Sequence, residues 1–543
     1  MNQKSLSARA FVLLLVLTSV VTAQTSAGPV SKVWVADRGD GTYRNPILHA
    51  DYSDPDAVRV GDDFYMTASS FNAAPGLPIL HSKDLVNWRL VAHVFARQRP
   101  LEHFSRPRHG EGVWAPSIRH HAGEFYIFYP DPDFGIYLTK AKHPAGPWSE
   151  PVLVKEAKGW IDPCPLWDDD GNAYLVSAMA ASRSGVKSVL VVSRMTSDGT
   201  RLLDDGVIVF DGHDQNPTLE GPKFYKRGGY YYIFAPAGGV EEGWQLVLRA
   251  KNVYGPYEAK VVLAQGKTAV NGPHQGAWVE TQTGESWFLH FQDKGAYGRI
   301  VHLQPVVWKN DWPVMGADPD GDGTGEPVET FRKPNVGRAW PVVTPPDSDE
   351  FDAPRLGLQW QWHANPGTHW AFPAPSYGYL RLFNRPLPDG TRNLWHVPNL
   401  LLQKFPAEKF TATARITFTP RTDEEETGLV VMGLDYAFVS VKKKPAGLFV
   451  SQTIARDAEG DARGEEGRLA PLKSNTFYLR VKVTEGAVCQ FSYSADGINF
   501  TPAGPPFTAR KGKWIGAKVG LFAVRTGTTR ETGYADVDWF RVE

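Results

Sequence analysis

Five segments of this chain resemble one another, and this repeat constrains the fold more than any other feature of the sequence. Each segment has one or two turn residues followed by an alternating run of aromatic and apolar side chains, typical of the second strand of a β-hairpin. The aligned aromatic residues of the five segments are Tyr65, Tyr126, Tyr174, Tyr231 and Trp287. The repeat therefore predicts five copies of one β-hairpin unit.

The aligned aromatic residues are 48 to 61 residues apart. An all-β repeat of about 50 residues indicates the blades of a β-propeller. Helical periodicity is nearly absent, and 52 Gly and 42 Pro residues supply the turns that short strands need. We therefore predict an all-β chain with a five-bladed β-propeller, its blades between about Arg44 and Asp311 and the whole domain over residues 40–335.

A second set of residues recurs 11 to 13 positions before the aligned aromatic residues. These residues are Asp54, Trp114, Asp162, Glu220 and His274. A single Asp-Pro pair is usually only a turn, but five sites in the same phase are hard to explain as turns. Because the first strand of each blade lines the central channel of a propeller, we expect the five side chains to meet in one pit on the axis.

Two or three carboxyl groups around one pit suit the hydrolysis of glycosidic bonds. One carboxyl group must donate a proton to the leaving oxygen, and another must activate water or attack carbon. Closely spaced like charges raise one pKa, which supplies the acid near neutral pH. A binding propeller could also use Asp and Trp for sugar, but it has no need of three carboxylates that repel one another.

Several motifs around these positions resemble family 43 of the glycoside hydrolases. They are Tyr-Arg-Asn-Pro-Ile-Leu at 43–48, the run from Asp51 to Met66, Gly-Val-Trp-Ala-Pro-Ser at 112–117, Asp-Pro at 162–163, Glu-Gly-Pro-Lys-Phe-Tyr at 220–225 and Gly-Pro-His-Gln-Gly at 272–276. The resemblance is to the β-xylosidase and α-L-arabinofuranosidase type, which carries a C-terminal β-sandwich. It implies an enzyme that inverts the anomeric carbon and forms no covalent intermediate. A pit that is closed at its inner end would accept only a chain end or a side branch, which predicts exo action.

The resemblance also implies a role for individual residues. Asp54 matches the general base, Glu220 the general acid, and Asp162 the carboxylate that orients the acid and tunes its pKa. Asp51 and Asp56 compete with Asp54 for the role of base, and we rank them lower because they lack its blade phase and motif position. The residues that match contacts to substrate are Arg299, which also pairs with the base, and the pocket walls Trp114 and Phe71.

Calcium is the cofactor that the sequence predicts, at two places. His274 matches a histidine that helps to hold a central calcium ion, mainly through water; since calcium prefers oxygen, a hydrogen-bonded channel residue is the alternative. Residues 318–329 fit the Asp-x-Asp-x-Asp-Gly-x5-Glu calcium loop, with Asp318, Asp320, Asp322 and Glu329 as ligands. Pro residues inside and before this loop argue against flanking helices, and a polar turn is the competing interpretation.

The chain after the propeller alternates again. A Pro-rich stretch over 336–346 indicates a linker, and residues 347–543 are predicted to form a concanavalin-like or jelly-roll β-sandwich. Three two-sided strands carry this prediction, at 410–418, 477–483 and 534–542. Some relatives place a sandwich aromatic residue in the active site, and the nearest matching position here is Lys518, at the pocket rim.

The first 23 residues have a basic start, an apolar run over 10–21 and small residues at 21–23, which predicts a signal peptide and a secreted or periplasmic protein. A net charge of −1 excludes a general affinity for nucleic acid, and no membrane contact is expected of the mature form. The two cysteines, Cys164 and Cys489, lie in different predicted domains, so we expect free, buried thiols.

The sequence thus predicts a secreted, exo-acting, inverting glycoside hydrolase that releases xylose or arabinofuranose from hemicellulose-derived oligosaccharides. Two alternatives stay open: a non-catalytic carbohydrate-binding propeller and an endo-acting arabinanase. The predicted partner is an oligosaccharide substrate. Neither the preference between the two pentoses nor the oligomeric state follows from the sequence.

Overall fold

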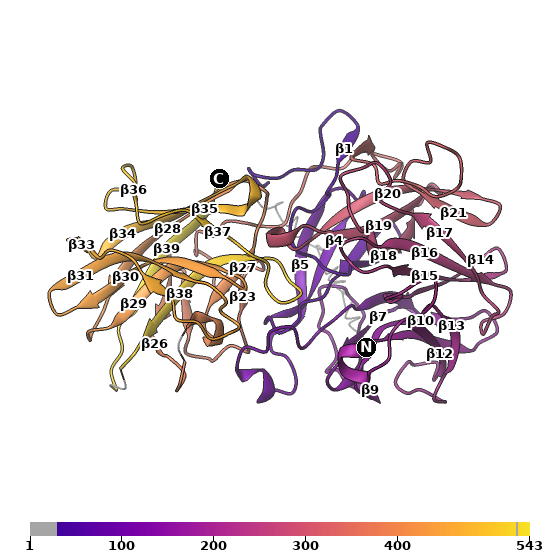
Figure 1. The fold of residues 1–543 in the computed structure, drawn as a ribbon, viewed down its shortest axis with the longest axis horizontal. Coiled ribbons are helices and arrows are strands. Elements are labelled where there is room, and N and C mark those ends of the chain that lie inside the picture. Colours follow the sequence, from indigo (N-terminus) through magenta and orange to yellow (C-terminus); the bar gives the residue numbers. More distant parts are fainter. Residues whose placement is uncertain (1–29, 392, 528–529) are drawn as a thin grey trace, which may run out of the picture.

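The computed structural model describes residues 30–543, except 392 and 528–529. It contains two β domains side by side, a propeller drawn in indigo to rose and a sandwich drawn in orange to yellow (Figure 1). The predicted signal peptide lies outside the described residues. Within them, no helix is long and apolar enough to cross a membrane.

The propeller has five four-stranded antiparallel blades, as the repeat predicts. The first two blades consist of β2 (Asp56–Val60), β3 (Asp63–Thr67), β4 (Gly76–Ser82) and β5 (Trp88–Phe95), then β6 (Ser117–His121), β7 (Glu124–Asp131), β8 (Gly135–Ala141) and β9 (Val152–Glu156). The third blade consists of β10 (Trp160–Trp167), β11 (Ala173–Met179), β12 (Val189–Met195) and β13 (Val207–Asp211). The last two consist of β14 (Lys223–Arg227), β15 (Tyr230–Ala237), β16 (Trp244–Ala250) and β17 (Glu258–Leu263), then β18 (His274–Glu280), β19 (Ser286–Asp293), β20 (Arg299–Lys309) and β21 (Trp312–Met315).

All five aligned aromatic residues lie in the second strand of a blade, which confirms the repeat as hairpins. The first strands contact one another in the order β18, β2, β6, β10 and β14, and β18 of the last blade contacts the fourth blade through β15 and β16. A short pair outside the blades, β1 (Thr42–Arg44) with β22 (Thr330–Arg332), joins the two ends of the domain. Regular helix is confined to α1 (Ala181–Ser184) and the short turns η1 (His103–Ser105), η2 (Gly295–Tyr297), η3 (Leu394–His396) and η4 (Glu485–Ala487) within the described residues.

Buried polar contacts join the inner strands of different blades. Asp56 accepts hydrogen bonds from Ile118 N (2.7 Å) and Arg119 Nη1 (2.6 Å), which joins β2 to β6. Lys223 on β14 donates to the carbonyl of Pro116 at 2.7 Å. Arg119 also donates to the thiol of Cys164 on β10 at 2.9 Å. Since buried polar groups need partners, these contacts fix the inner strands on which the site is built.

The sandwich packs two mainly antiparallel sheets face to face. One sheet contains β23 (Gln361–Trp362), β26 (Arg385–Pro386), β27 (Leu401–Lys404), β29 (Glu425–Met432), β30 (Tyr436–Lys444), β31 (Gly447–Ala455), β32 (Glu465–Glu466), β33 (Ala470–Leu472) and β38 (Lys518–Arg525). The other contains β24 (Ala371–Ala374), β25 (Tyr379–Phe383), β28 (Phe410–Thr419), β34 (Thr476–Thr484), β35 (Val488–Ser494), β36 (Thr501–Pro502), β37 (Phe507–Thr508) and β39 (Tyr534–Val542). The three strands predicted from alternation are β28, β34 and β39, which are neighbours in the second sheet. Cys164 and Cys489 are free and buried, as expected.

Candidate active site

The three predicted carboxyl groups line one pocket, whose empty volume is about 750 Å³ with the open solvent at its mouth included. Asp54 comes from the segment before β2, Asp162 from β10 and Glu220 from the segment before β14. Trp114, Phe71 and Arg299 line the same pocket. The structure therefore brings together the six residues that the sequence assigns to catalysis and substrate binding.

Unusual backbone positions aim two of these carboxyl groups. Asp54 and Asp162 both have φ near 56°, in the left-handed region where Asp is one of the few tolerated residues with a Cβ. At Asp162 the pairing of β10 with β11 also shifts register between Ile161 and Cys164. Such bulges re-aim side chains next to active sites. The Asp-Pro motifs thus mark sites where the inner strand turns a carboxyl group toward the axis.

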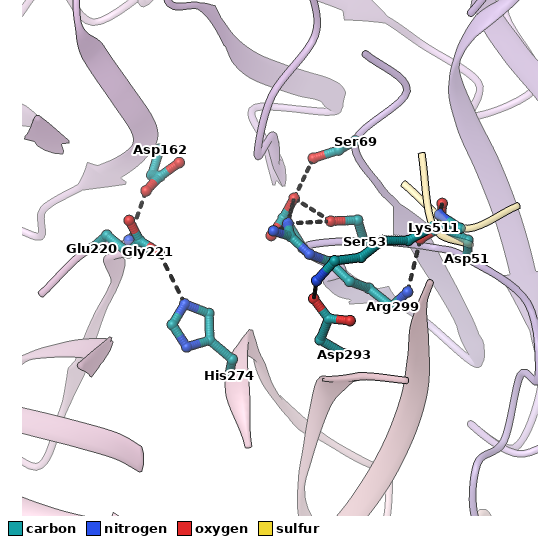
Figure 2. A network of polar contacts seen from close by, with 12 residues as sticks. Asp51, Ser53, Ser69, Asp162, Glu220, Gly221, His274, Asp293, Arg299 and Lys511 are labelled. Atoms are coloured by element: carbon teal, nitrogen blue, oxygen red, sulfur yellow. Dashed lines mark hydrogen bonds and ion pairs between the residues drawn. The ribbon is translucent and has the colours of Figure 1, made fainter. Parts of the chain in front are cut away.

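Asp54 lies among hydrogen-bond donors. Its Oδ2 accepts bonds from Ser53 Oγ at 2.6 Å and Ser69 Oγ at 2.5 Å. Arg299 Nη1 lies 3.2 Å from Asp54 Oδ1 and also donates to Ser53 Oγ at 2.8 Å. Figure 2 shows Ser53, Ser69 and Arg299 gathered on one side of the site. Charge-assisted bonds of this kind are short and fix the orientation of a carboxyl group, which a general base needs in order to meet the attacking water.

The other two carboxyl groups form a pair on the opposite side (Figure 2). Asp162 Oδ2 accepts a hydrogen bond from Gly221 N at 2.7 Å, and Glu220 Oε1 lies 3.0 Å from His274 Nε2. Burial raises the pKa of Asp162 well above its usual value, and the charges of Glu220 and then Asp54 add to the effect. Because Asp162 is wholly buried while the Glu220 side chain is 27% exposed, Glu220 is the member of the pair that can meet a substrate.

Two other acidic residues do not reach the pocket. Both oxygens of Asp51 accept backbone hydrogen bonds, from Arg299 N at 2.9 Å and Gly516 N at 3.0 Å. Asp56 is wholly buried among the inner strands. Neither lines the pocket, which agrees with the lower rank that the sequence gave them as bases.

The pocket wall includes one residue that the sequence did not identify. Trp514, from a sandwich loop, lines the pocket and meets Trp114 with ring centroids 6.2 Å apart. Phe71 lies 6.4 Å from Trp114 on the centroids. The prediction that Lys518 occupies the rim was wrong, because Lys518 starts β38, is buried and donates to Gln361 Oε1 at 3.4 Å.

The surroundings of His274 provide few ligands for calcium. Its Nε2 faces Glu220, and its buried Nδ1 has no hydrogen-bond partner among the described residues. Within the described ranges, no group of three His, Cys or carboxylate ligand atoms surrounds His274. Calcium prefers six to eight oxygen ligands, so direct protein ligation does not fit here. Central calcium stays a prediction, and no chemical step below depends on it.

The acidic loop places only part of its predicted ligands together. Asp318, Asp320 and Asp322 offer carboxylate oxygens within 4.8 Å of one another, and Glu329 is not part of this group. The chain pairs as extended backbone at Glu326, through a bridge with Ala317. Lys309 Nζ lies 3.0 Å from Asp318. Calcium in this loop therefore also stays a prediction.

Comparisons with known proteins agree with this geometry. The profile of the glycosyl hydrolases family 43 matches residues 43–313. The chain belongs to this family. The profile of the β-xylosidase C-terminal concanavalin A-like domain matches residues 348–543. The protein is thus a glycoside hydrolase with a five-bladed propeller and a C-terminal sandwich.

Relatives of this family 43 enzyme cover nearly its whole length. It is 41% identical over 498 residues to a "Putative beta-xylosidase" of Xylanibacter ruminicola, an alignment of 90% of this chain and 88% of that one. It is 30% identical to a "Non-reducing end alpha-L-arabinofuranosidase BoGH43B" of Bacteroides ovatus, with 94% and 96% covered. A solved xylan β-1,4-xylosidase from Bacillus halodurans superposes with a TM-score of 0.81 at 26% identity, over 92% of this chain and 99% of that one.

Proposed function

We propose that this family 43 enzyme is a secreted, exo-acting, inverting hydrolase that releases xylose, arabinofuranose or both from hemicellulose-derived oligosaccharides. The observation that carries the proposal is that Asp54, Asp162 and Glu220, which come from three blades, line one pocket with aromatic walls. Relatives named for β-xylosidase and α-L-arabinofuranosidase activity support the choice of pentose.

In the proposed mechanism, Glu220 protonates the leaving glycosidic oxygen while Asp54 removes a proton from the attacking water. Attack and departure occur on opposite faces of the sugar, so the anomeric centre inverts and no covalent intermediate forms. Arg299 holds Asp54 through its guanidinium. Asp162, buried beside Glu220, keeps a proton on the pair to a higher pH than an isolated carboxyl group would.

The shape of the site supports exo action. Trp114 and Phe71 of the propeller and Trp514 of the sandwich form walls of the pocket. Flat aromatic rings suit the apolar faces of a sugar, and a walled pocket admits a chain end or a side branch more readily than the middle of a polymer. Arabinofuranose and xylose present similar hydroxyl groups, so we propose that both enter.

The proposal also includes export and calcium binding, and both are supported by sequence patterns alone. The segment over residues 1–23 has the pattern of a cleaved leader. Calcium is proposed as structural support, in the loop of Asp318, Asp320 and Asp322 or near His274, with no part in proton transfer.

The proposal is tested with 4-nitrophenyl β-D-xyloside, 4-nitrophenyl α-L-arabinofuranoside and xylobiose. Glu220→Gln should lower kcat for xylobiose by about 10²–10⁴-fold, since proton donation contributes this much. It should lower kcat far less for a 2,4-dinitrophenyl xyloside, whose leaving group needs no proton. Asp54→Asn should abolish hydrolysis of both substrates.

Proton NMR of the first product identifies the anomer, and an α-xylose product from a β-xyloside is expected. Retention of configuration would overturn the mechanism. Tight pentose binding without hydrolysis of any activated substrate would favour a binding propeller, and release of oligosaccharides from arabinan would favour endo action.

A further inference from the structure

Asp51 connects the two domains next to the pocket without entering it. It lies between β1 and β2, and its side chain is buried. Its Oδ1 accepts the backbone N–H of Arg299 in the propeller at 2.9 Å. Its Oδ2 accepts the backbone N–H of Gly516 in the sandwich at 3.0 Å. One carboxylate thus holds two backbone segments that are far apart in the sequence.

The two segments touch at glycine residues. Gly298 has φ near 75°, and a Cβ there would lie 2.6 Å from both Asp51 Cγ and Gly516 N. A Cβ on Gly516 would lie 2.8 Å from Gly298 N. Next to this contact, Ala517 N donates to the carbonyl of Ala296 at 2.7 Å. The carboxylate of Asp51 therefore occupies a close contact that leaves no room for larger residues.

Each segment that Asp51 holds carries a pocket residue. The Arg299 side chain reaches Ser53 Oγ and Asp54. Two residues before Gly516, Trp514 forms the sandwich wall of the pocket. Figure 2 shows Asp51 beside the sandwich loop, drawn in yellow, that carries Lys511. A shift of Asp51 would thus displace the partner of Asp54 and an aromatic wall together.

We propose that Asp51 is a positioning residue, which fixes Arg299 and Trp514 relative to each other and so sets the geometry of the pocket across the domain boundary. The catalytic part of this inference rests on the proposed function of Asp54 and Arg299. The clamp itself rests only on the contacts of the Asp51 carboxylate.

The charge of the carboxylate is needed as well as its shape. Burial lowers the pKa of Lys404 and of Lys518, and the negative charge of Asp51 offsets part of this lowering at both groups. Asn at this position would offer one acceptor and one NH₂ group. One of the two backbone N–H groups would then lose its partner, and an unsatisfied buried donor is costly.

A second contact of the same loop cannot replace the clamp. Lys511 pairs with Glu241 at 3.1 Å and with Asp293 at 3.5 Å, but its side chain is 40% exposed. Exposed ion pairs contribute little and leave the side chains mobile. The buried carboxylate, together with the backbone bond from Ala517 N to the Ala296 carbonyl, therefore holds the loop at a defined distance from Arg299.

Hydrogen exchange of the full chain tests the clamp. In Asp51→Asn, the backbone amides of residues 295–300 and 511–517 should exchange at least tenfold faster than in the wild type, and in both segments together. The matched control is Asp349→Asn, since Asp349 also accepts two backbone N–H bonds, from Phe351 at 2.9 Å and Gly357 at 3.2 Å, within the sandwich. The control should leave both segments unchanged.

Kinetics test the positioning role. Asp51→Asn should lower kcat/KM for xylobiose by about 10–100-fold, as a displacement of about 1 Å can do, while Asp349→Asn lowers Tm with little change in kcat/KM. In a background that carries both Arg299→Ala and Trp514→Ala, Asp51→Asn should lower kcat/KM by less than about threefold more, because the two pocket residues through which Asp51 acts are gone. If Asp51→Asn does not fold, Gly516→Ala provides a second test, because its added methyl group acts from the sandwich side and pushes residue 516 away from Gly298. This variant should also speed hydrogen exchange in residues 295–300 and 511–517.

Unchanged exchange in the two segments would overturn the clamp. The positioning role would be overturned if Asp51→Asn lowered kcat/KM by the same factor in the Arg299→Ala, Trp514→Ala background as in the wild type, or if Asp349→Asn caused an equal loss. A wild type that hydrolyses no pentoside would overturn the proposed function instead, and the exchange experiment would still decide the clamp.

Discussion

The protonation of the pocket depends on how Asp162 and Glu220 share a proton. Asp162 is wholly buried, and its carboxyl group has one strong donor, the N–H of Gly221 at 2.7 Å. Burial and the negative charge of Glu220 raise its pKa well above the usual value. When two carboxyl groups interact this strongly, the apparent pKa values belong to the pair.

Replacing Asp162 with Asn should therefore move the alkaline limb of kcat/KM to lower pH. In the wild type, each carboxylate of the pair disfavours loss of the proton from the other, so the pair stays singly protonated to a higher pH. An amide removes that repulsion, and the remaining acid loses its proton earlier. The profile between pH 4 and 9, with a substrate that needs an acid, measures the shift.

The control for this variant is Asp168→Asn in the same blade, because Asp168 pairs with Lys226 and does not line the pocket. It should leave the profile in place. An alkaline limb that stays fixed or moves upward in Asp162→Asn would contradict the assigned coupling.

Two neighbouring strands of the sandwich carry a pair of lysines, of which Lys518 is buried and Lys404 is half-buried. Lys404 on β27 and Lys518 on β38 are directly opposite each other in the antiparallel ladder. Burial, together with the charge of Lys404, lowers the pKa of Lys518 to about 7 from 10.5. Like charges directly opposite each other destabilise a sheet, so these strands are expected to be less stable when both lysines are protonated.

Lys518→Met should stabilise the protein more at pH 6 than at pH 9. Between about pH 7 and 10 the unfolded chain binds a proton at Lys518 that the folded chain does not, so wild-type stability from this group rises with pH. Met has no group that titrates, so the Tm of Lys518→Met should exceed that of the wild type by several degrees at pH 6. Exposed Lys482→Met is the control, and a gain that is equal at both pH values would contradict the argument.

The sandwich loop should contribute to substrate affinity through Trp514. The Trp514 side chain is 47% exposed and meets Trp114 edge to face. Loss of aromatic contact of this kind removes about 1 kcal/mol, so Trp514→Ala should raise KM for xylobiose about five- to tenfold with a smaller change in kcat. Trp539→Ala on β39, which contacts Tyr478 away from the pocket, is the control. A fall in kcat at constant KM would indicate a different role.

The elements were predictable where the pattern is local. The β28, β34 and β39 strands alternate because one face packs into the sandwich core, and the five hairpins repeat because each blade places the same aromatic position in its second strand. Which loop residue meets the pocket depends instead on how two domains dock. The sequence of the 511–518 segment shows a Trp and a Lys, and only the docked structure distinguishes Trp514 in the pocket from Lys518 in the strand pair.

At the scale of the whole molecule, the two domains share a core. Tyr297 and Ile300 of the propeller pack into the hydrophobic cluster of the sandwich. Backbone bonds also cross the boundary, such as Trp362 N to the Ala74 carbonyl at 2.6 Å and Asn365 N to the Phe104 carbonyl at 2.8 Å. The sequence predicted two domains and a linker, but the contacts that join them come from loops without any periodic pattern, so their extent could not be predicted.

This shared core predicts that the linker is dispensable once the chain has folded. A protease site inserted between Gly337 and Pro341, where the chain is largely exposed, should allow complete cleavage while both halves elute together in gel filtration. Hydrolysis of aryl xylosides should stay within about twofold of the uncut protein, because Asp51, Gly516 and the Tyr297 contact hold Trp514 against the pocket without help from the linker. Adding Asp51→Asn to the cut protein should weaken the association of the halves, since one of the buried bonds across the boundary is then lost. Separate elution of the two halves of the cut wild type, or loss of activity on cleavage alone, would show that the linker and not the interface holds the domains in register.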